Sequence, residues 1–159
     1  IPQDQGECHH ELELALLIGS QLTRANEQAC LSAIAGIGLG IDLTLRDIQN
    51  ELKAKGQPWE RAKAFDGSCP LSPFVEPGER DLQQLDLSLW RNGKLQQHGN
   101  TRDILFPVGS LLAEISHTFS LLPGDVVMTG TPAGVGPLVS GDELVLALDE
   151  LLRVETTVL

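Results

Sequence analysis

The 159-residue sequence predicts a single β-rich α+β domain with a few short helices. Short runs in which apolar and polar residues alternate fill much of the chain, above all after residue 81, and this period of two is typical of strands. Apolar residues at helical spacing are confined to residues 27–35, 45–55 and 104–121. A chain of this length buries roughly two-thirds of the surface that it exposes when unfolded, which suffices for one hydrophobic core.

The first predicted strand covers residues 9–18. Because successive side chains of a strand point to opposite faces, His10 lies on the core face with the leucines that follow it. His9, Glu11 and Glu13 lie on the other face. Apolar residues continue that second face, so we expect it to be covered farther along and to leave a cleft around the two glutamates.

A helix over residues 27–35, a strand over 37–43 and a helix over 45–55 are predicted next. Asn26 and Thr44 are the candidate N-caps of the two helices, because their side-chain oxygens can accept a hydrogen bond from the first helical turn. The glycines of the strand allow close approach of neighbouring backbone.

The remainder of the chain is predicted to contain loops, short strands and one longer helix. Asn92-Gly93 between two alternating runs indicates a hairpin. The glycine-rich stretch over residues 130–137 indicates either a ligand-binding loop or a tight turn. In chain order, the elements are a loop over 57–77, strands over 85–90 and 95–98, a helix over 104–121, and strands over 126–128, 143–148 and 153–158.

The composition disfavours several classes of partner. The net charge of −11, from 22 acidic and 11 basic residues, has the wrong sign for neutralising phosphates, so we expect no nucleic acid partner. The apolar runs fall short of the roughly 18 residues of a membrane span, so we expect no membrane partner. Cys8, Cys30 and Cys69 form no C-x-x-C pair, which disfavours a disulfide framework or a cysteine zinc site and favours a reducing cytoplasm.

Three carboxylates form a candidate metal site. Glu11 and Glu13, two positions apart on one strand face, have α-carbons about 6–7 Å apart, so both can turn toward one ion. Asp42 lies on the glycine-bearing face of a second apolar strand, where a buried carboxylate without a partner would be costly. Oxygen ligands suit Mg²⁺ or Mn²⁺. The ordinary alternative for two such glutamates is a solvated strand face.

Other candidates have equally ordinary alternatives. Arg46 and Gln49 share a helix face one turn after Asp42 and would overhang an ion there, or they form a solvated face. Lys63, between small and aromatic neighbours, is otherwise an exposed lysine. His9 is a candidate base, a candidate support for the metal ligands or a structural histidine, and His10 is expected to be packed in the core.

Four motifs in order carry a family resemblance: "HHELELALLIG", "GIDLTLRDIQ", "GQPWERAKAFDGSCPLSPF" and "GDVVMTGTPAGVGPLVSGD". Together they resemble the fumarylacetoacetate hydrolase family, in particular its small bacterial and mitochondrial branch. That branch contains acylpyruvate hydrolases, oxaloacetate-acting enzymes and isomerase/decarboxylases of aromatic catabolism. The resemblance implies a mixed β-sandwich roll of the family's C-terminal type, usually a homodimer.

The resemblance also implies site residues. It places Mg²⁺ or Mn²⁺ on Glu11, Glu13 and Asp42. It gives Arg46, Gln49, Lys63 and Thr131 as substrate-binding residues, with Lys63 also catalytic. Members of the branch carry a His/Glu catalytic pair and a lid before the first of these motifs. Since nothing precedes Ile1 here, we expect residues 1–159 to form one catalytic domain that lacks this segment.

The function that the resemblance implies is that of a divalent-metal-dependent enzyme acting on small 2,4-dioxo or 2-oxo acids through a metal-stabilised enolate. The reaction would be acylpyruvate C–C bond hydrolysis, or oxaloacetate tautomerisation or decarboxylation, and the partner a small dicarboxylic or oxo acid. One alternative is a 2-hydroxyhepta-2,4-diene-1,7-dioate isomerase/decarboxylase. A second is a non-catalytic relic that binds a metal or another ligand.

Overall fold

The computed structural model describes residues 1–159 and contains three sheets and four short α-helices. The strands are β1 (Cys8–His10), β2 (Leu12–Ile18), β3 (Ile34–Ile41), β4 (Thr44–Leu45), β5 (Asp86–Arg91), β6 (Lys94–Asn100), β7 (Val126–Met128), β8 (Gly136–Leu138), β9 (Glu143–Leu148) and β10 (Leu152–Thr157). The helices are α1 (Glu27–Ser32), α2 (Arg46–Ala54), α3 (Glu60–Lys63) and α4 (Val108–Thr118), with a 3-10 turn, η1, at Thr101–Asp103.

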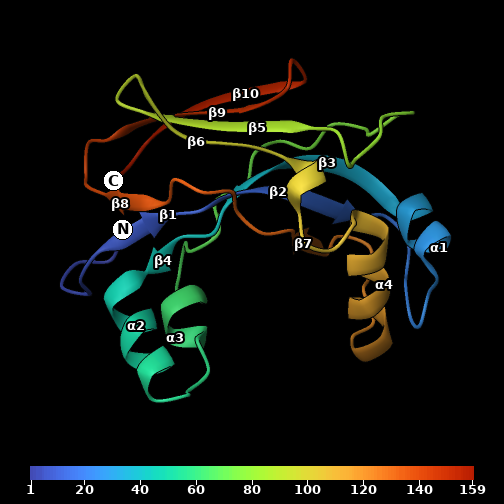
Figure 1. Ribbon diagram of the computed structural model, residues 1–159, viewed down its shortest axis with the longest axis horizontal. Coiled ribbons are helices and arrows are strands. Elements are labelled where there is room, and N and C mark those ends of the chain that lie inside the picture. Colours follow the sequence, from blue (N-terminus) through green and yellow to red (C-terminus); the bar gives the residue numbers. More distant parts are fainter.

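The sheets confirm the predicted β-rich roll. Their strand orders are β4-β1-β8, β3-β2-β7 and β10-β9-β5-β6, and all neighbouring strands are antiparallel. In Figure 1 the four-stranded sheet lies over the sheet that contains β2, with α2 and α3 at one end of the molecule and α1 and α4 at the other. No helix has the length and apolar character that crossing a membrane requires.

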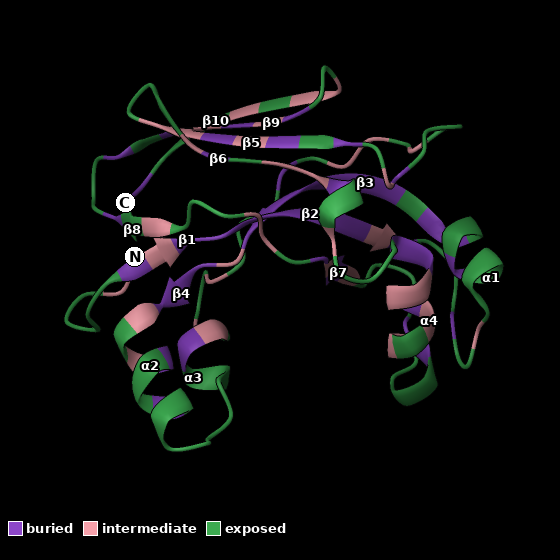
Figure 2. Ribbon diagram, in the orientation of Figure 1, coloured by how far each residue is buried: buried purple, intermediate pink, exposed green.

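The core lies between these two sheets. Leu12, Leu14 and Leu16 of β2 are fully buried and belong to the same hydrophobic cluster as Leu89 of β5 and Leu148 of β9. Each such side chain contributes roughly 1.5–3 kcal/mol of transfer free energy relative to an exposed one. Figure 2 shows that β2 is buried along all but a short stretch near its end, whereas the helices expose much of their surface. The contacts of β2 with the four-stranded sheet in this core therefore hold the strand firmly in place.

The first predicted strand is in fact two strands. The strand is interrupted at Glu11. Before this residue β1 pairs with β4 and β8, and after it β2 pairs with β3 and β7. His10 is nevertheless fully buried, as predicted. Glu11 thus lies at the point where the chain passes from one sheet to another.

The helix boundaries differ from the prediction at three places. The side chain of Asn26 caps α1 as expected, accepting the Ala29 N–H at 2.9 Å, but α1 ends early because β3 has begun by residue 34. Thr44 is not a helix cap; it belongs to β4, and Leu45 takes the N-cap position of α2. The predicted helix over 104–121 begins only after Pro107, whose ring is favourable in the first turn but not inside a helix.

Two loop predictions have different outcomes. The turn at Asn92-Gly93 joins β5 to β6 with φ values of 51° and 74°, the left-handed conformation that a two-residue hairpin requires. The predicted loop over 57–77, by contrast, contains α3. A four-residue helix is too short to produce a periodic pattern in the sequence.

Candidate metal centre

The three predicted carboxylates lie together. One oxygen each from Glu11, Glu13 and Asp42 lies within 4.8 Å of the others. The pairing of β2 with β3 places Glu13 opposite Gly40, and the Asp42 N–H donates to the Glu11 carbonyl at 2.8 Å, so the end of β3 is held beside the start of β2. Glu11 and Glu13 are only 9% and 5% exposed. The alternative of a solvated strand face is therefore wrong.

Two cationic side chains converge on this cluster. Lys63 Nζ donates to Glu11 Oε2 at 2.9 Å, to Asp42 Oδ2 at 2.5 Å and to Thr44 Oγ1 at 2.7 Å. Arg46 donates from Nη2 to Glu11 Oε1 at 2.5 Å and from Nη1 to Gln49 Oε1 at 2.6 Å. Helices α2 and α3 thus bring Arg46 and Lys63 to the carboxylates, so the alternative of ordinary exposed side chains does not hold for either residue.

The cations act unequally on the three carboxylates. Burial raises the pKa of Glu13 to about 7, against the one hydrogen bond from the Gly130 N–H, and the charges of Asp42 and Glu11 raise it further. Burial also favours a raised pKa for Glu11, but hydrogen bonds from Lys63 and Arg46 outweigh it and the pKa lies below its ordinary value. Glu13 is consequently the carboxylate that retains a proton most readily.

The pKa values of the other two groups reflect the same competition. Burial raises the pKa of Asp42 above its ordinary value, although Lys63 donates to this carboxylate. Burial would lower the pKa of Lys63, but its hydrogen bonds to Asp42 and Glu11 hold that pKa above its ordinary value. The lysine is therefore a full positive charge beside the cluster.

The donor set fits a divalent cation. The cluster consists of three carboxylates whose charge is only partly balanced by Arg46 and Lys63. Glu13 contacts no cationic side chain, and its one hydrogen bond comes from the Gly130 N–H at 2.6 Å. Hard oxygen donors within reach of one another, including a buried carboxylate without a counter-ion, are the arrangement that Mg²⁺ or Mn²⁺ would complete.

Thr131 lies beside the cluster, but its hydroxyl is engaged by the protein. Its Oγ1 donates to the Leu12 carbonyl at 2.8 Å and accepts from Gln97 Nε2 at 2.8 Å. The residue before it, Gly130, is the donor to Glu13. The segment that contains both residues joins β7 to β8.

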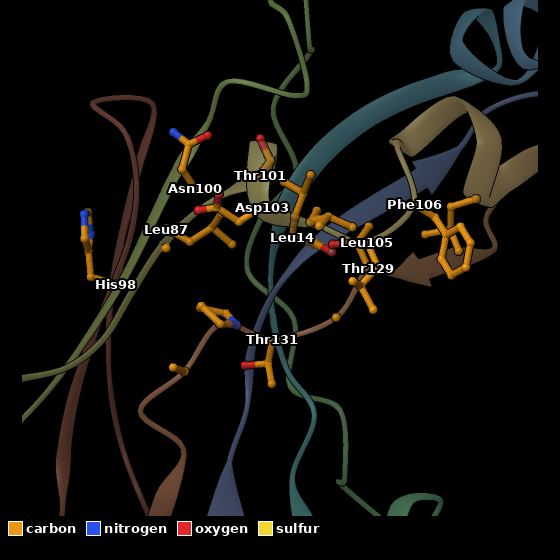
Figure 3. A pocket seen from close by; sticks show the side chains of 16 residues that line it. Leu14, Leu87, His98, Asn100, Thr101, Asp103, Leu105, Phe106, Thr129 and Thr131 are labelled. Atoms are coloured by element: carbon orange, nitrogen blue, oxygen red, sulfur yellow. Dashed lines mark hydrogen bonds between the residues drawn. The ribbon is translucent and has the colours of Figure 1, made fainter.

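The same segment borders a separate cavity of about 560 Å³, which Figure 3 shows from close by. Leu14 lines this cavity and Glu13 does not, as the alternation of faces along β2 requires. The segment from Gly130 to Ala133 therefore lines the cavity and, through Gly130, also contacts the carboxylate cluster.

The two histidines have no direct contact with the carboxylates. His9 Nε2 lies 3.0 Å from Glu7 Oε2, which makes a structural role the simpler interpretation. His10 is packed in the core as predicted, with Nδ1 at 2.8 Å from Gln97 Oε1. Sequence reasoning did not assign Thr44 or Gln97 to the site, although Thr44 accepts from Lys63 and Gln97 donates to Thr131. The signal for Gln97 was an amide on a strand at the position where an apolar side chain would be expected to face the core.

Comparison with known proteins decides the family. Residues 1–159 match the family model described as "Fumarylacetoacetate (FAA) hydrolase C-terminal". The chain belongs to the fumarylacetoacetate hydrolase family. Among its relatives within the family is the oxaloacetate tautomerase YcgM of Escherichia coli strain K12, which is 54% identical over 151 residues, covering 94% of this chain and 69% of that protein.

Solved structures of the family have the same fold. A crystal structure of a fumarylacetoacetate hydrolase family protein from Yersinia pestis CO92 matches with a TM-score of 0.97 and 52% identity, covering 100% of this chain and 73% of that one. The fumarylpyruvate hydrolase from Pseudomonas aeruginosa, whose crystal structure is in complex with Mn²⁺ and pyruvate, matches with a TM-score of 0.94 and 31% identity, covering 100% and 69%. The resemblance predicted from the four motifs is confirmed.

Proposed function

We propose that the protein is a divalent-metal-dependent oxaloacetate tautomerase, which interconverts the keto and enol forms of that acid. The observation that carries the proposal is the convergence of Arg46 and Lys63 on the carboxylate cluster, because it places two cations where an acidic substrate would meet a metal ion. The 54% identity to the Escherichia coli tautomerase supports this choice of substrate.

The helix α2 would hold the substrate's carboxylate. Arg46 is held by Glu11 and Gln49, and its side chain remains 22% exposed. Gln49 Oε1 accepts from Arg46, so the two hydrogens of its Nε2 remain to be donated to a ligand. An arginine and an amide side by side supply the planar array of donors that a carboxylate accepts.

Lys63 would stabilise the charge that develops during the reaction. Tautomerisation from keto to enol moves a proton from the methylene C3 to the C2 oxygen, so negative charge grows on that oxygen. A divalent ion held by Glu11, Glu13 and Asp42 would supply a Lewis acid for it. The ammonium of Lys63 adds a fixed positive charge in a site of low dielectric, where it stabilises an oxyanion more than it would in water. The resemblance assigns the proton transfer to a His/Glu pair before residue 1, outside the described residues.

A second candidate function is hydrolysis of an acylpyruvate. It is favoured by the match to the fumarylpyruvate hydrolase whose structure holds Mn²⁺ and pyruvate. Both reactions require the same stabilisation of an enolate, so the carboxylate cluster and Lys63 serve either one. The isomerase/decarboxylase of aromatic catabolism and the non-catalytic relic are tested by the same substrate panel.

We also propose that the protein works as a homodimer in a reducing cytoplasm. All three cysteines are free thiols, as such a compartment favours. Leu105 and Phe106 are 92% and 63% exposed, and contact with a second chain would remove these apolar side chains from water. Light scattering on the purified protein tests the oligomeric state: a mass of twice the chain supports the dimer, and a single-chain mass contradicts it.

The test of the activity is a panel of dioxo and oxo acids assayed with Mg²⁺, with Mn²⁺ and with EDTA. The proposal predicts that the enol absorbance of oxaloacetate decays faster with metal and protein than with metal alone, and that EDTA removes the difference. Faster loss of acetylpyruvate instead would favour the hydrolase. No metal-dependent turnover on any acid would contradict both proposed activities.

A further inference from the structure

We propose that Gln97 is a positioning residue for the metal centre: its buried amide holds the loop from Gly130 to Pro132 against β2, and this loop orients Glu13. Gln97 lies in β6, outside all the residues that the motifs pointed to, and it is fully buried. The inference rests on the carboxylate cluster of the proposed function, which it deepens by identifying what holds one of the three ligands.

The amide of Gln97 uses all its hydrogen-bonding capacity. Its Oε1 accepts from the Leu12 N–H at 3.0 Å and lies 2.8 Å from His10 Nδ1. Its Nε2 donates to Thr131 Oγ1 at 2.8 Å and to the Pro132 carbonyl at 2.9 Å. Because a main-chain N–H can only donate and a carbonyl can only accept, the orientation of the amide is fixed. His10 must therefore carry its proton on Nδ1 and donate it to Gln97.

The shape of the loop brings it close to β6. A Cβ at Gly134, where φ is +100°, would overlap the carbonyl oxygen of Gln96. A Cβ at Gly99 would lie 2.5 Å from the Cβ of Pro132. Two glycines thus permit the loop to lie directly on the backbone of β6, and Gln97 provides the polar contact between these two points.

The loop passes this constraint to Glu13. Thr131, held by Gln97, donates to the Leu12 carbonyl, and its neighbour Gly130 donates its N–H to Glu13 Oε2 at 2.6 Å. Figure 3 shows Thr131 beside β2, on the segment that continues to Thr129.

The N–H that donates to Glu13 belongs to the peptide between Thr129 and Gly130, which Thr129 anchors on one side through its bonds to the Leu14 carbonyl. Thr131 anchors Gly130 on the other side, so a displaced Thr131 would shift the one donor that orients Glu13. Groups that hydrogen-bond a metal ligand directly, as the Gly130 N–H would, typically affect metal affinity 10–100-fold, and Gln97 acts one step behind that group.

The test separates positioning from general destabilisation. The variant Gln97→Met keeps the volume and removes all four contacts of the amide. The matched control is Ser116→Ala in α4, because Ser116 is also buried and also joins two backbone groups, accepting from the Ala25 N–H and donating to the Ala113 carbonyl. Both variants are expected to lower the melting temperature. Calorimetric titration with Mn²⁺ is expected to show at least a tenfold loss of affinity in Gln97→Met and less than a twofold change in Ser116→Ala.

A double-mutant cycle tests the route through Thr131. Thr131→Val removes the hydroxyl from the same network and is expected to lose Mn²⁺ affinity as Gln97→Met does, whereas Thr131→Ser is expected to retain it. The variant with both Gln97→Met and Thr131→Val should bind no more weakly than the weaker single variant, because the two side chains act as one unit.

Unchanged Mn²⁺ affinity in a folded Gln97→Met variant would overturn the proposal, and so would losses that multiply in the double variant. If Gln97→Met does not fold, equal affinity in Thr131→Val and Thr131→Ser would overturn it instead. Amide exchange gives a readout without metal: the Gly130 N–H is expected to lose protection in Thr131→Val but not in Ser116→Ala. None of these measurements needs a substrate, so they stand or fail independently of the tautomerase activity.

Discussion

Two walls of opposite character border the carboxylate cluster. The charged wall, Arg46 and Lys63 on α2 and α3, donates to both oxygens of Glu11 and lowers its pKa. The neutral wall, the loop from Gly130 to Pro132 with Gln97 behind it, donates only a main-chain N–H to Glu13, and burial raises that pKa to about 7. The difference means that one wall balances charge and the other does not, so that Glu13 is left without a cationic partner. Under our proposal a metal ion would be its counter-ion, and the neutral wall would orient this carboxylate.

The largest expected effect comes from the charged wall. Lys63→Met removes three hydrogen bonds and the positive charge between Glu11 and Asp42. We expect kcat for the tautomerisation to fall at least about 100-fold, because a fixed charge beside a developing oxyanion contributes on that scale. The matched control is Lys55→Met, which removes an exposed lysine paired only with Glu51. If steady-state kinetics gave the same kcat for the two variants, Lys63 would have no catalytic role.

The neutral wall predicts a pH dependence. Because the pKa of Glu13 is raised to about 7, this carboxyl holds a proton below that pH, and an incoming cation must displace it. We expect Mn²⁺ affinity to fall up to roughly tenfold per pH unit as the pH drops from 7 toward 5 and to level off above 8. Calorimetry in two buffers of different ionisation enthalpy should also detect proton release on binding at pH 6.5. Affinity that is constant from pH 5 to 8 would show that Glu13 is not the titrating ligand.

A smaller change in the charged wall tests whether Arg46 and Lys63 have different roles. Arg46→Lys retains the charge but cannot contact Glu11 and Gln49 together, because a lysine lacks the planar fork of a guanidinium. We expect KM for oxaloacetate to rise about tenfold, with a smaller change in kcat, if Arg46 binds the substrate's carboxylate. Arg61→Lys in α3, which lies outside the cluster's contacts, serves as the control. A fall in kcat at constant KM would instead place Arg46 with Lys63 in the chemical step.

The smallest expected effect lies away from both walls. The Asn26 side chain caps α1 by accepting the Ala29 N–H, and Asn26→Ala removes this hydrogen bond. The substitution should lower the free energy of unfolding by about 1 kcal/mol. Denaturant unfolding measures that loss, and a Mn²⁺ titration of the same variant should match the wild type. A loss of affinity here would mean that metal binding follows global stability, and the contrast between the two walls would not hold.

The sequence predicts the carboxylates of the site better than their surroundings. Glu11 and Glu13 could be grouped because strand alternation places them on one face. Asp42 could be added from its apolar, glycine-rich surroundings and from the family resemblance, although the structure places it just after β3 rather than on a strand face. The break of the first strand at Glu11 could not be predicted, since it depends on β1 and β2 joining different sheets. Lys63 gave no local signal because α3 is held in place by its contacts rather than by its own four residues.

Thr44 and Gln97 show why tertiary context decides the rest. Thr44 has the side chain of a good helix cap, yet it pairs in β4 and accepts from Lys63. Gln97 lies in the second strand of a hairpin that the sequence predicts well, but its four contacts come from segments 34 to 87 residues away. Contacts at such separations leave no periodic trace in the chain, and only the sheet topology brings them together.

The most direct test of the metal centre is a Mn²⁺ titration of the wild type and of Asp42→Asn, in which binding is measured by calorimetry and by the change in melting temperature. Asp42→Asn keeps the size of the side chain and removes one of the three carboxylates, and Asp103→Asn on the exposed turn η1 is the control. We predict that Mn²⁺ binds saturably to the wild type and to the control and raises their melting temperatures. We predict that Asp42→Asn shows neither the binding nor the rise in melting temperature. Equal binding in all three proteins would contradict the assignment of the cluster as the metal site.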